Sequence, residues 1–400
     1  MKGLARIQIL VEMKKRLQQS LLESNWIFVL WAVIASFGAY FCMYAFRKPF
    51  SAGIYEGLLL WGVGYKAILI IAQVAGYTIS KFAGIKVISE LQPKNRIWLI
   101  IALIIFAEIA LFLFGMGSHP YNFIFLFLNG LPLGMVYGVV FSFLEGRRLT
   151  EMLAMGLSIS VVIASGILKT IYIEIHLLMP GITEFWMPFF MGLIFLPLFL
   201  IFVWMLSVIP DPTPADIKSR TERLPMSAQD KRDVLSRFGV PIFCLVVCYA
   251  GLVVLRDFRD NFMIEIWNEI DAGWESGVLA QTELICGLVV FVIIGGLVFV
   301  KSHLVGFRLT NVILLAGMLF SGLATYLFEE GIIGGFTWML SIGIGFFLSY
   351  TAIQTVVFER FIALFRIKAN AGYFVYLCES IGYLGSASLL LYKEFFMKEM

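Results

Sequence analysis

Residues 97–116 of the 400-residue chain are IWLIIALIIFAEIALFLFGM, a run in which Glu108 is the single charged side chain. About 20 mostly apolar residues suffice to cross the hydrocarbon core of a bilayer as an α-helix, so this run predicts a transmembrane helix. The rest of the chain agrees, because 60% of its residues are hydrophobic and 14% are charged. Soluble domains have about 25% charged residues. The composition therefore excludes an ordinary globular enzyme, a disordered chain and a nucleic-acid-binding domain.

Similar apolar runs predict eleven spans in total. They cover residues 25–46, 65–82, 97–116, 121–143, 154–175, 185–208, 240–255, 276–300, 309–328, 332–357 and 369–392. The longest polar stretch, 209–239, holds four prolines and six Lys or Arg residues and separates six spans from five. We therefore expect an all-α polytopic membrane protein with a basic lead-in (1–24), a six-helix bundle (25–208), a linker (209–239) and a five-helix bundle (240–400).

The distribution of basic residues predicts how the chain is oriented. If the N-terminus is cytoplasmic, 22 of the 30 Lys and Arg residues lie in inside segments and 6 in outside segments. This bias obeys the positive-inside rule. We expect a multi-pass protein of the inner (plasma) membrane whose lead-in and linker are cytoplasmic. The second bundle is shorter by about one span, so either a twelfth helix follows residue 400 or the chain has eleven spans and an outward C-terminus.

Three short motifs resemble one branch of a known transporter superfamily. They are YAFRKPF at 44–50, SKF at 80–82 with the loop to Arg96, and VLR at 254–256. Together with the two predicted bundles, they resemble the major facilitator superfamily, and the motifs are closest to its organophosphate:phosphate antiporter branch. The chain departs from that branch at Leu91, where the family has arginine, in lacking the histidine of helix 5, and in lacking helix 12. The pattern is also similar to an uncharacterised bacterial membrane-protein family related to the superfamily, which implies the fold but no substrate.

The resemblance implies a site made by one arginine from each half, Arg47 and Arg256, which would hold the substrate phosphate. Guanidinium offers a planar, permanently charged fork for phosphate or carboxylate oxygens. Arg259 lies three residues after Arg256 and could replace or assist it. The alternative is that these arginines only reach the outer interface. Asp257 and Asp260 could neutralise the arginines beside them and leave Arg47 as the only free cation.

Ionisable residues within spans are costly and mark functional sites by default. Lys169 could be a second anion contact, or a lysine that reaches the interface. Lys48, Glu283 and Glu379 could pair with cavity charges or take part in coupling, and a buried carboxyl could take up a coupling proton. A purely structural partner is an equal alternative. Glu108 is the weakest candidate of this kind.

Several polar side chains lie in the first, fourth, seventh and tenth spans, which line the cavity in this fold: Tyr40, Tyr44, Asn129, Tyr137, Tyr249, Tyr350 and Gln354. Each could hydrogen-bond a substrate, although tyrosine is also an ordinary packing residue. Gly130, Gly134 and Gly138 repeat every four residues, which favours close helix contact over cofactor binding.

The sequence contains no nucleotide-binding loop, zinc motif or nucleophile elbow, so we expect no cofactor, no metal and no catalysis. The leading hypothesis is a monomeric secondary active transporter in the lipid bilayer that moves a small anionic solute by alternating access. An organic phosphate exchanged for inorganic phosphate is the first expectation and a carboxylate the second. The alternatives are a sensor that binds a ligand without transport and a proton-coupled transporter of another metabolite.

Overall fold

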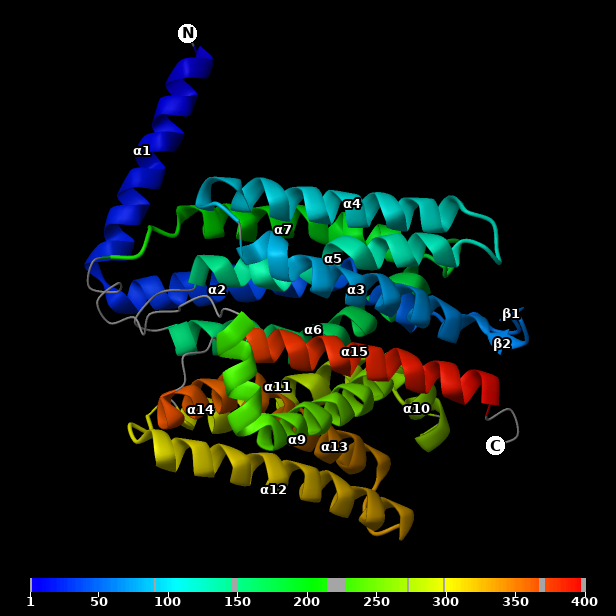
Figure 1. The fold of residues 1–400 in the computed structure, drawn as a ribbon. Helices are drawn as coiled ribbons and strands as arrows, with labels where there is room; N and C mark the ends of the chain where they lie inside the picture. Colours follow the sequence, from blue (N-terminus) through cyan, green and yellow to red (C-terminus); the bar gives the residue numbers. More distant parts are fainter. Residues whose placement is uncertain are drawn as a thin grey trace.

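The computed structural model describes residues 2–89, 91–144, 150–213, 228–271, 273–297, 299–366 and 371–396. The helices are α1 (Lys2–Glu23), α2 (Asn25–Ala45), α3 (Tyr65–Ser89), α4 (Arg96–Met116), α5 (Phe123–Leu144), α6 (Thr150–Leu178), α7 (Met187–Val208), α9 (Ala228–Asn261), α10 (Met263–Ile270), α11 (Gly277–Leu297), α12 (His303–Glu329), α13 (Gly335–Ala352), α14 (Phe358–Phe365) and α15 (Ala371–Phe396). Short turns are η1 (Pro49–Ala52), η2 (Pro93–Asn95) and the π-helical η3 (Ile353–Val357). Figure 1 shows the long helices lying side by side.

The predicted all-α polytopic membrane fold is confirmed. Within the described ranges, ten helical segments are long and apolar enough to cross a membrane. They coincide with the first ten predicted spans, and a helix is the stable form there because it satisfies every backbone polar group without water. The predicted span at 369–392 falls on α15, a helix of 26 residues that is not among the ten.

The helices form two groups in space. In the first helix group, α2–α7, helix α3 packs on α5, α5 on α4, and α2 on α6 and α7. In the second helix group, α9–α15, helix α9 packs on α15, and α13 packs on both α11 and α12. The groups meet along α3 with α15 and α6 with α11, and Figure 1 shows them as an upper and a lower layer. The predicted domain boundaries stay a prediction, with linker residues 214–227 outside the described ranges.

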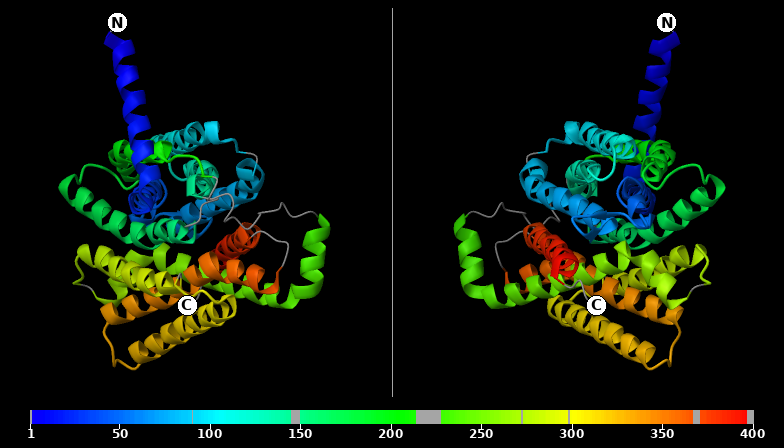
Figure 2. Two further views of the ribbon diagram at one scale, coloured as in Figure 1. Left: turned by 90° about the vertical axis from the view of Figure 1, so that its left-hand side faces the viewer. Right: turned by 90° about the vertical axis from the view of Figure 1, so that its right-hand side faces the viewer.

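Two details add to the expected layout. Within the predicted linker, α9 begins at Ala228 and continues through a kink at Phe238 into the seventh span. The lead-in is a helix, α1, that runs across the spans instead of along them (Figures 1 and 2).

The close contact predicted from the span-four glycines is present between α3 and α5. A Cβ atom added to Gly130 would lie 2.3 Å from the carbonyl oxygen of Gln73, and one added to Gly134 would lie 2.7 Å from that of Tyr77. Both positions therefore require glycine, because a side chain would separate the two helices.

The two ends of the spans can be told apart by what caps them. A two-stranded antiparallel hairpin, β1 (Leu59–Leu60) and β2 (Val63–Gly64), lies at one end, the hairpin end. Helices α2 and α4 start at the opposite end, the linker end, where α7 finishes. Exposed Trp26 and Trp98 lie at the linker end and exposed Trp61 at the hairpin end. Tryptophan concentrates at membrane–water interfaces, so these residues mark the two surfaces.

Candidate functional site

Arg47 lies between the two helix groups, two residues after the end of α2. Its side chain is 4% exposed. The guanidinium carbon lies 3.9 Å from the ring centre of Tyr77 and 5.7 Å from those of Tyr44 and Tyr383. Among the described residues, no carboxylate forms an ion pair with it. The guanidinium of Arg47 therefore lies near aromatic rings, which attract a cation but supply no negative charge to neutralise it.

The backbone around Arg47 is fixed by two amide side chains. Gln73 Nε2 donates to the carbonyl of Arg47 at 2.8 Å, and Asn129 Nδ2 donates to that of Phe46 at 3.0 Å and that of Ala107 at 3.1 Å. The amide of Asn129 therefore holds the chain after α2 in place. This corrects the expectation that Asn129 faces a substrate, since both of its amide protons bind carbonyl oxygens.

Arg256 comes from α9 of the second helix group and also lies beside Tyr383. Its Nη2 donates to Asp257 at 2.7 Å and to the hydroxyl of Tyr383 at 3.3 Å, and its guanidinium carbon is 4.3 Å from the ring centre of Tyr350. Both Arg256 and Arg47 lie within 6 Å of the Tyr383 ring, at 5.8 and 5.7 Å. The two predicted arginines, one from each group, thus meet at one tyrosine.

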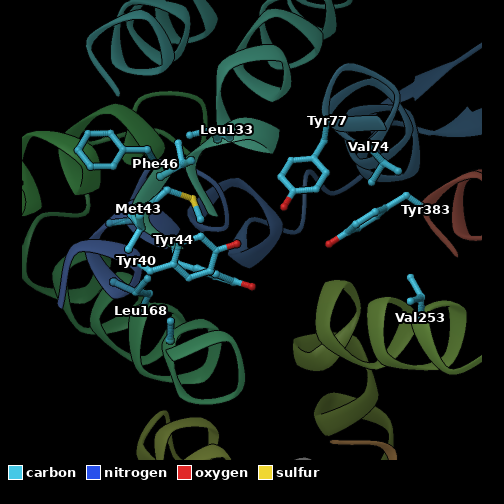
Figure 3. Close-up of a cluster of buried hydrophobic side chains, with 14 of the residues drawn as sticks. Tyr40, Met43, Tyr44, Phe46, Val74, Tyr77, Leu133, Leu168, Val253 and Tyr383 are labelled. Carbon is cyan, nitrogen blue, oxygen red and sulfur yellow. The ribbon is translucent and has the colours of Figure 1, made fainter. Parts of the chain in front are cut away.

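Further tyrosines surround this meeting point. The Tyr40 ring packs edge-on against Tyr44 at 5.6 Å and Tyr137 at 5.4 Å, and Tyr249 packs on Tyr350 at 5.1 Å. Figure 3 shows the hydroxyls of Tyr44, Tyr77 and Tyr383 pointing toward the same space between the groups.

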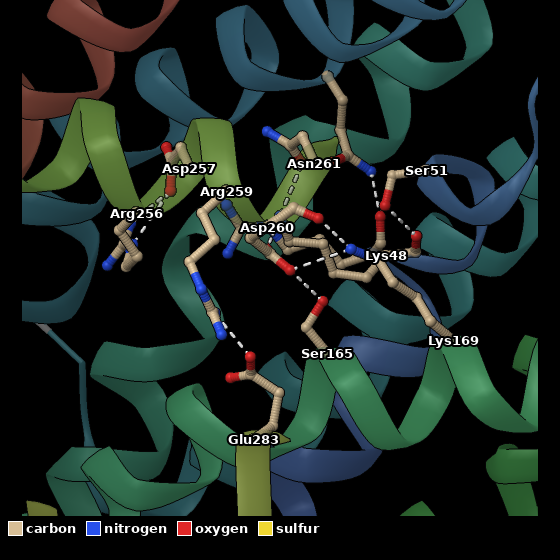
Figure 4. A network of polar contacts seen from close by, with 12 residues as sticks. Lys48, Ser51, Ser165, Lys169, Arg256, Asp257, Arg259, Asp260, Asn261 and Glu283 are labelled. Atoms are coloured by element: carbon tan, nitrogen blue, oxygen red, sulfur yellow. Dashed lines mark hydrogen bonds and ion pairs between the residues drawn. The ribbon is translucent and has the colours of Figure 1, made fainter. Parts of the chain in front are cut away.

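Lys48 and Lys169 of the first group both bind Asp260 of the second. Lys48 Nζ lies 2.5 Å from Asp260 Oδ2 and Lys169 Nζ lies 3.1 Å from Oδ1, and Lys48 also donates to Asn261 Oδ1 at 2.9 Å. The hydroxyl of Ser165 donates to the same carboxylate (Figure 4). Lys169 is 0% exposed, so the alternative in which it reaches the interface is wrong. Asp260 neutralises lysines, not the arginines beside it.

Arg259 and Glu283 form a pair inside the second group. Arg259 Nη1 lies 2.6 Å from Glu283 Oε1, and Nη2 donates to the Met339 carbonyl at 3.2 Å. Glu283 therefore balances the charge of Arg259, as Asp257 balances that of Arg256.

Lys81 and Glu379 form a second ion pair between the groups, closer to the linker end. Gln354, on the π-helical turn η3, donates to Glu379 Oε1 at 3.0 Å, and the Tyr350 hydroxyl lies 3.5 Å from the same oxygen. Lys81 is 1% exposed. Sequence reasoning quoted Lys81 only as part of the SKF motif at the end of the predicted span 65–82, whereas the helix continues to Ser89.

The remaining predicted or overlooked charges lie away from the arginines. Lys66, at the start of α3, pairs with Glu265 of α10 at the hairpin end. Glu108 lies between α4 and α7 with both carboxylate oxygens buried and without a hydrogen-bond partner among the described residues. Sequence reasoning also overlooked Tyr77 and Tyr383, whose signal was only their position inside apolar helices.

A cavity lies among these side chains between the groups. Its lining comprises Tyr44, Arg47, Lys48, Val161, Val162, Ser165, Arg256, Asp257, Arg259, Asp260, Glu283 and Phe347. When Lys169, which pairs with Asp260, is included, the described residues place five cations around three carboxylates, an excess of two positive charges. The enclosed volume is about 10 Å³, room for about one water molecule, so the groups are closed around the charges.

One family model covers most of the chain. The model described as "Family of unknown function (DUF5690)" matches residues 49–400. The chain belongs to this family. The match includes Arg256, Lys81 and Glu379 and begins two residues after Arg47. No curated protein matches the sequence of this DUF5690 member.

Solved structures of transporters are similar to the DUF5690 chain in fold. The nucleoside transporter NupG is 14% identical with a TM-score of 0.60, covering 92% of this chain and 91% of its own. A bacterial homolog of the human lysosomal transporter Spinster, in an inward-facing and unoccupied conformation, is 12% identical with a TM-score of 0.61, covering 92% and 82%. The D-xylose-proton symporter is 12% identical with a TM-score of 0.51, covering 91% and 88%. The TM-scores show that the chain shares the fold of these transporters, a major-facilitator-like fold in a multi-pass membrane protein.

Proposed function

We propose that the protein is a secondary active transporter that moves a small anion by alternating access between the two helix groups. The N-terminus would be cytoplasmic and the protein would lie in the inner (plasma) membrane, as the excess of basic residues in the lead-in and linker favours. The transporter-like fold and the charged, buried contact between the groups support this function. Transport at such a contact requires only that the groups rock about it.

The observation that carries the anion assignment is the uncompensated Arg47. Its guanidinium is buried among tyrosine rings, and the cavity beside it holds two more cations than carboxylates. A buried charge without a partner is unfavourable in a membrane interior. A bound dianion would supply the missing negative charge.

Two chemical classes of dianion fit the arginines. A phosphate ester or a dicarboxylate presents paired oxygens that match the fork of Arg47 and Arg256, one from each group. The motif resemblance favours an organic phosphate exchanged for inorganic phosphate, so we place that class first. Because the closed cavity has room for about one water molecule, the groups must separate before either solute enters.

Proton-coupled transport is a second candidate, supported by the Lys81–Glu379 pair. A proton on Glu379 would neutralise this carboxylate partner of Lys81 and favour the binding of an anion beside the ammonium group. A proton and an anion would then bind together, and the proton gradient would drive accumulation.

The test is uptake into proteoliposomes of labelled inorganic phosphate, a phosphate monoester and a dicarboxylate, with and without a counter-solute inside. Arg47→Lys keeps the charge without the fork and Arg47→Gln removes both, while Arg308→Gln, an exposed arginine in α12, is the matched control. We expect uptake of one of the anions to fall at least tenfold in both Arg47 variants and to be unchanged in the control.

Each other outcome selects a different function. Anion binding that raises thermal stability without any flux would make the protein a sensor. Uptake that does not depend on Arg47 would reject the arginine site, and the absence of both binding and uptake for every anion would reject the anionic substrate.

A further inference from the structure

A second cavity lies at the linker end of the first helix group, away from the central charges. Its volume is about 470 Å³, within the range of about 300–1,000 Å³ typical of ligand pockets. It is bounded by α1, the starts of η2 and α4, the end of α5 and the end of α7. The lining comprises Lys14, Gln18, Pro93, Lys94, Arg96, Ile97, Ser142, Phe143, Leu206, Ser207, Ile209, Pro210, Asp211 and Pro212.

This cavity lies at the depth of the membrane surface. Three of the helices around it are spans that begin or end there, α4 at Arg96, α5 at Leu144 and α7 at Val208. Exposed Trp26 and Trp98, at the starts of α2 and α4, mark the same surface. Whatever occupies the cavity therefore lies among the phospholipid head groups.

Among the described residues that line the cavity, three are basic, Lys14, Lys94 and Arg96, and one is acidic, Asp211. The Arg96 guanidinium lies 5.5 Å from the ring centre of Phe143, which holds its position at the wall. Beside the cations, the wall is apolar at Ile97, Phe143, Leu206 and Ile209. Cationic groups next to apolar ones match a ligand that has a phosphate and a hydrocarbon part.

Helix α1 closes the cavity from the outside and lies in the plane expected for an interfacial helix. It leaves the spans at a steep angle and extends beyond the first helix group (Figures 1 and 2). One face of its last turns packs toward the body of the protein, with residues spaced three or four apart: Lys14, Leu17, Gln18 and Leu21. Lys15 and Arg16 are exposed. A basic helix of this kind is attracted to anionic membrane surfaces.

We propose that this cavity binds the head group of an anionic phospholipid, with Lys14 of α1 and Lys94 and Arg96 beside α4 around its phosphate. The lipid would join α1 to the first helix group at the membrane surface. The site is separate from the anion site at Arg47 and does not depend on transport.

The test uses the full-length protein, purified and delipidated in a neutral detergent. Phosphatidylglycerol or phosphatidylcholine is added, and bound lipid is counted by native mass spectrometry while the unfolding temperature is recorded. Lys14→Gln with Lys94→Gln removes two cations from the wall. The matched control, Lys301→Gln with Arg308→Gln, removes two exposed cations from the linker end of the second helix group.

We expect phosphatidylglycerol to bind and raise the unfolding temperature of the wild type and the control, and phosphatidylcholine to do so at least tenfold more weakly. The Lys14/Lys94 variant should lose at least tenfold in apparent affinity for phosphatidylglycerol while keeping its unfolding temperature without lipid. Equal loss in the control, equal binding of both lipids, or a site saturated by inorganic phosphate without lipid would each overturn the proposal. All of these readouts are independent of flux, so failure here leaves the transporter proposal intact.

Discussion

Glu379→Gln is the substitution that most directly tests the contact between the two helix groups. Lys81 and Glu379 are 1% and 5% exposed, so the pair is almost completely removed from solvent. Glutamine retains an oxygen for the bond from Gln354 but leaves the Lys81 ammonium without its carboxylate. Breaking a buried pair from one side costs about 3–5 kcal/mol, because an uncompensated charge remains.

We therefore expect Glu379→Gln to lower the free energy of unfolding by about 3 kcal/mol or more. The double variant, Lys81→Met with Glu379→Met, removes both charges, and replacing a buried pair by apolar side chains is often neutral. It should recover most of the loss. The assay is unfolding by SDS in mixed micelles, followed by tryptophan fluorescence, and the double-mutant cycle gives the coupling between the two positions.

Lys81→Met provides an internal check. This variant leaves the buried Glu379 carboxylate without its lysine, so it should lower the free energy of unfolding about as much as Glu379→Gln does. Additive effects of the two single changes, or a Glu379→Gln protein as stable as the wild type, would refute the buried pair and the proton-coupled candidate with it.

Two further predictions follow from the packing and from the hairpin end. Gly130→Ala should destabilise the protein by about 1–3 kcal/mol in the same unfolding assay, because the new methyl group meets the backbone of α3, whereas Gly251→Ala, with no atom within 4 Å of its added Cβ, should not. Lys66→Gln removes the ion pair at the hairpin end. In a Ser165→Cys background, this change should increase several-fold the rate at which the new thiol reacts with a membrane-impermeant thiol reagent. Glu269→Gln, an exposed control in α10, should leave that rate unchanged, and equal rates in the two variants would reject a closure at Lys66.

The helices could be predicted from sequence because the bilayer imposes a simple length and composition on each of them. Arg47 was singled out because its motif resembles that of a transporter branch and because arginine is uncommon at the outer end of a span. The close approach of α3 and α5 was visible in the glycine repeat beginning at Gly130. Each of these signals is local, contained in about one helix of sequence.

The partners of the charges could not be predicted, because they depend on how distant helices meet. Lys81 and Glu379 are 298 residues apart, and Lys48 and Asn261 are 213 residues apart. A sequence shows that a lysine and a carboxylate are both buried but not that they touch. For that reason the sequence offered Lys169 as an anion contact, whereas the folded chain places it on Asp260.

Helix α3 places the contacts between the groups in order of depth. Lys66 pairs with the second group at the hairpin end, Tyr77 meets Arg47, and Lys81 pairs with Glu379 toward the linker end. At 1.5 Å per residue, Lys66 and Lys81 lie about 22 Å apart along α3, with the Arg47 site between them. Opening the linker end would separate Lys81 from Glu379, and an anion bound beside Lys81 would offset part of the cost of breaking that pair. An anionic solute that entered from that end would supply the missing charge as the pair breaks, so its binding would lower the cost of the opening that admits it. In the transport that we propose, the solute thus acts as a counter-ion that allows the two helix groups to separate at the linker end.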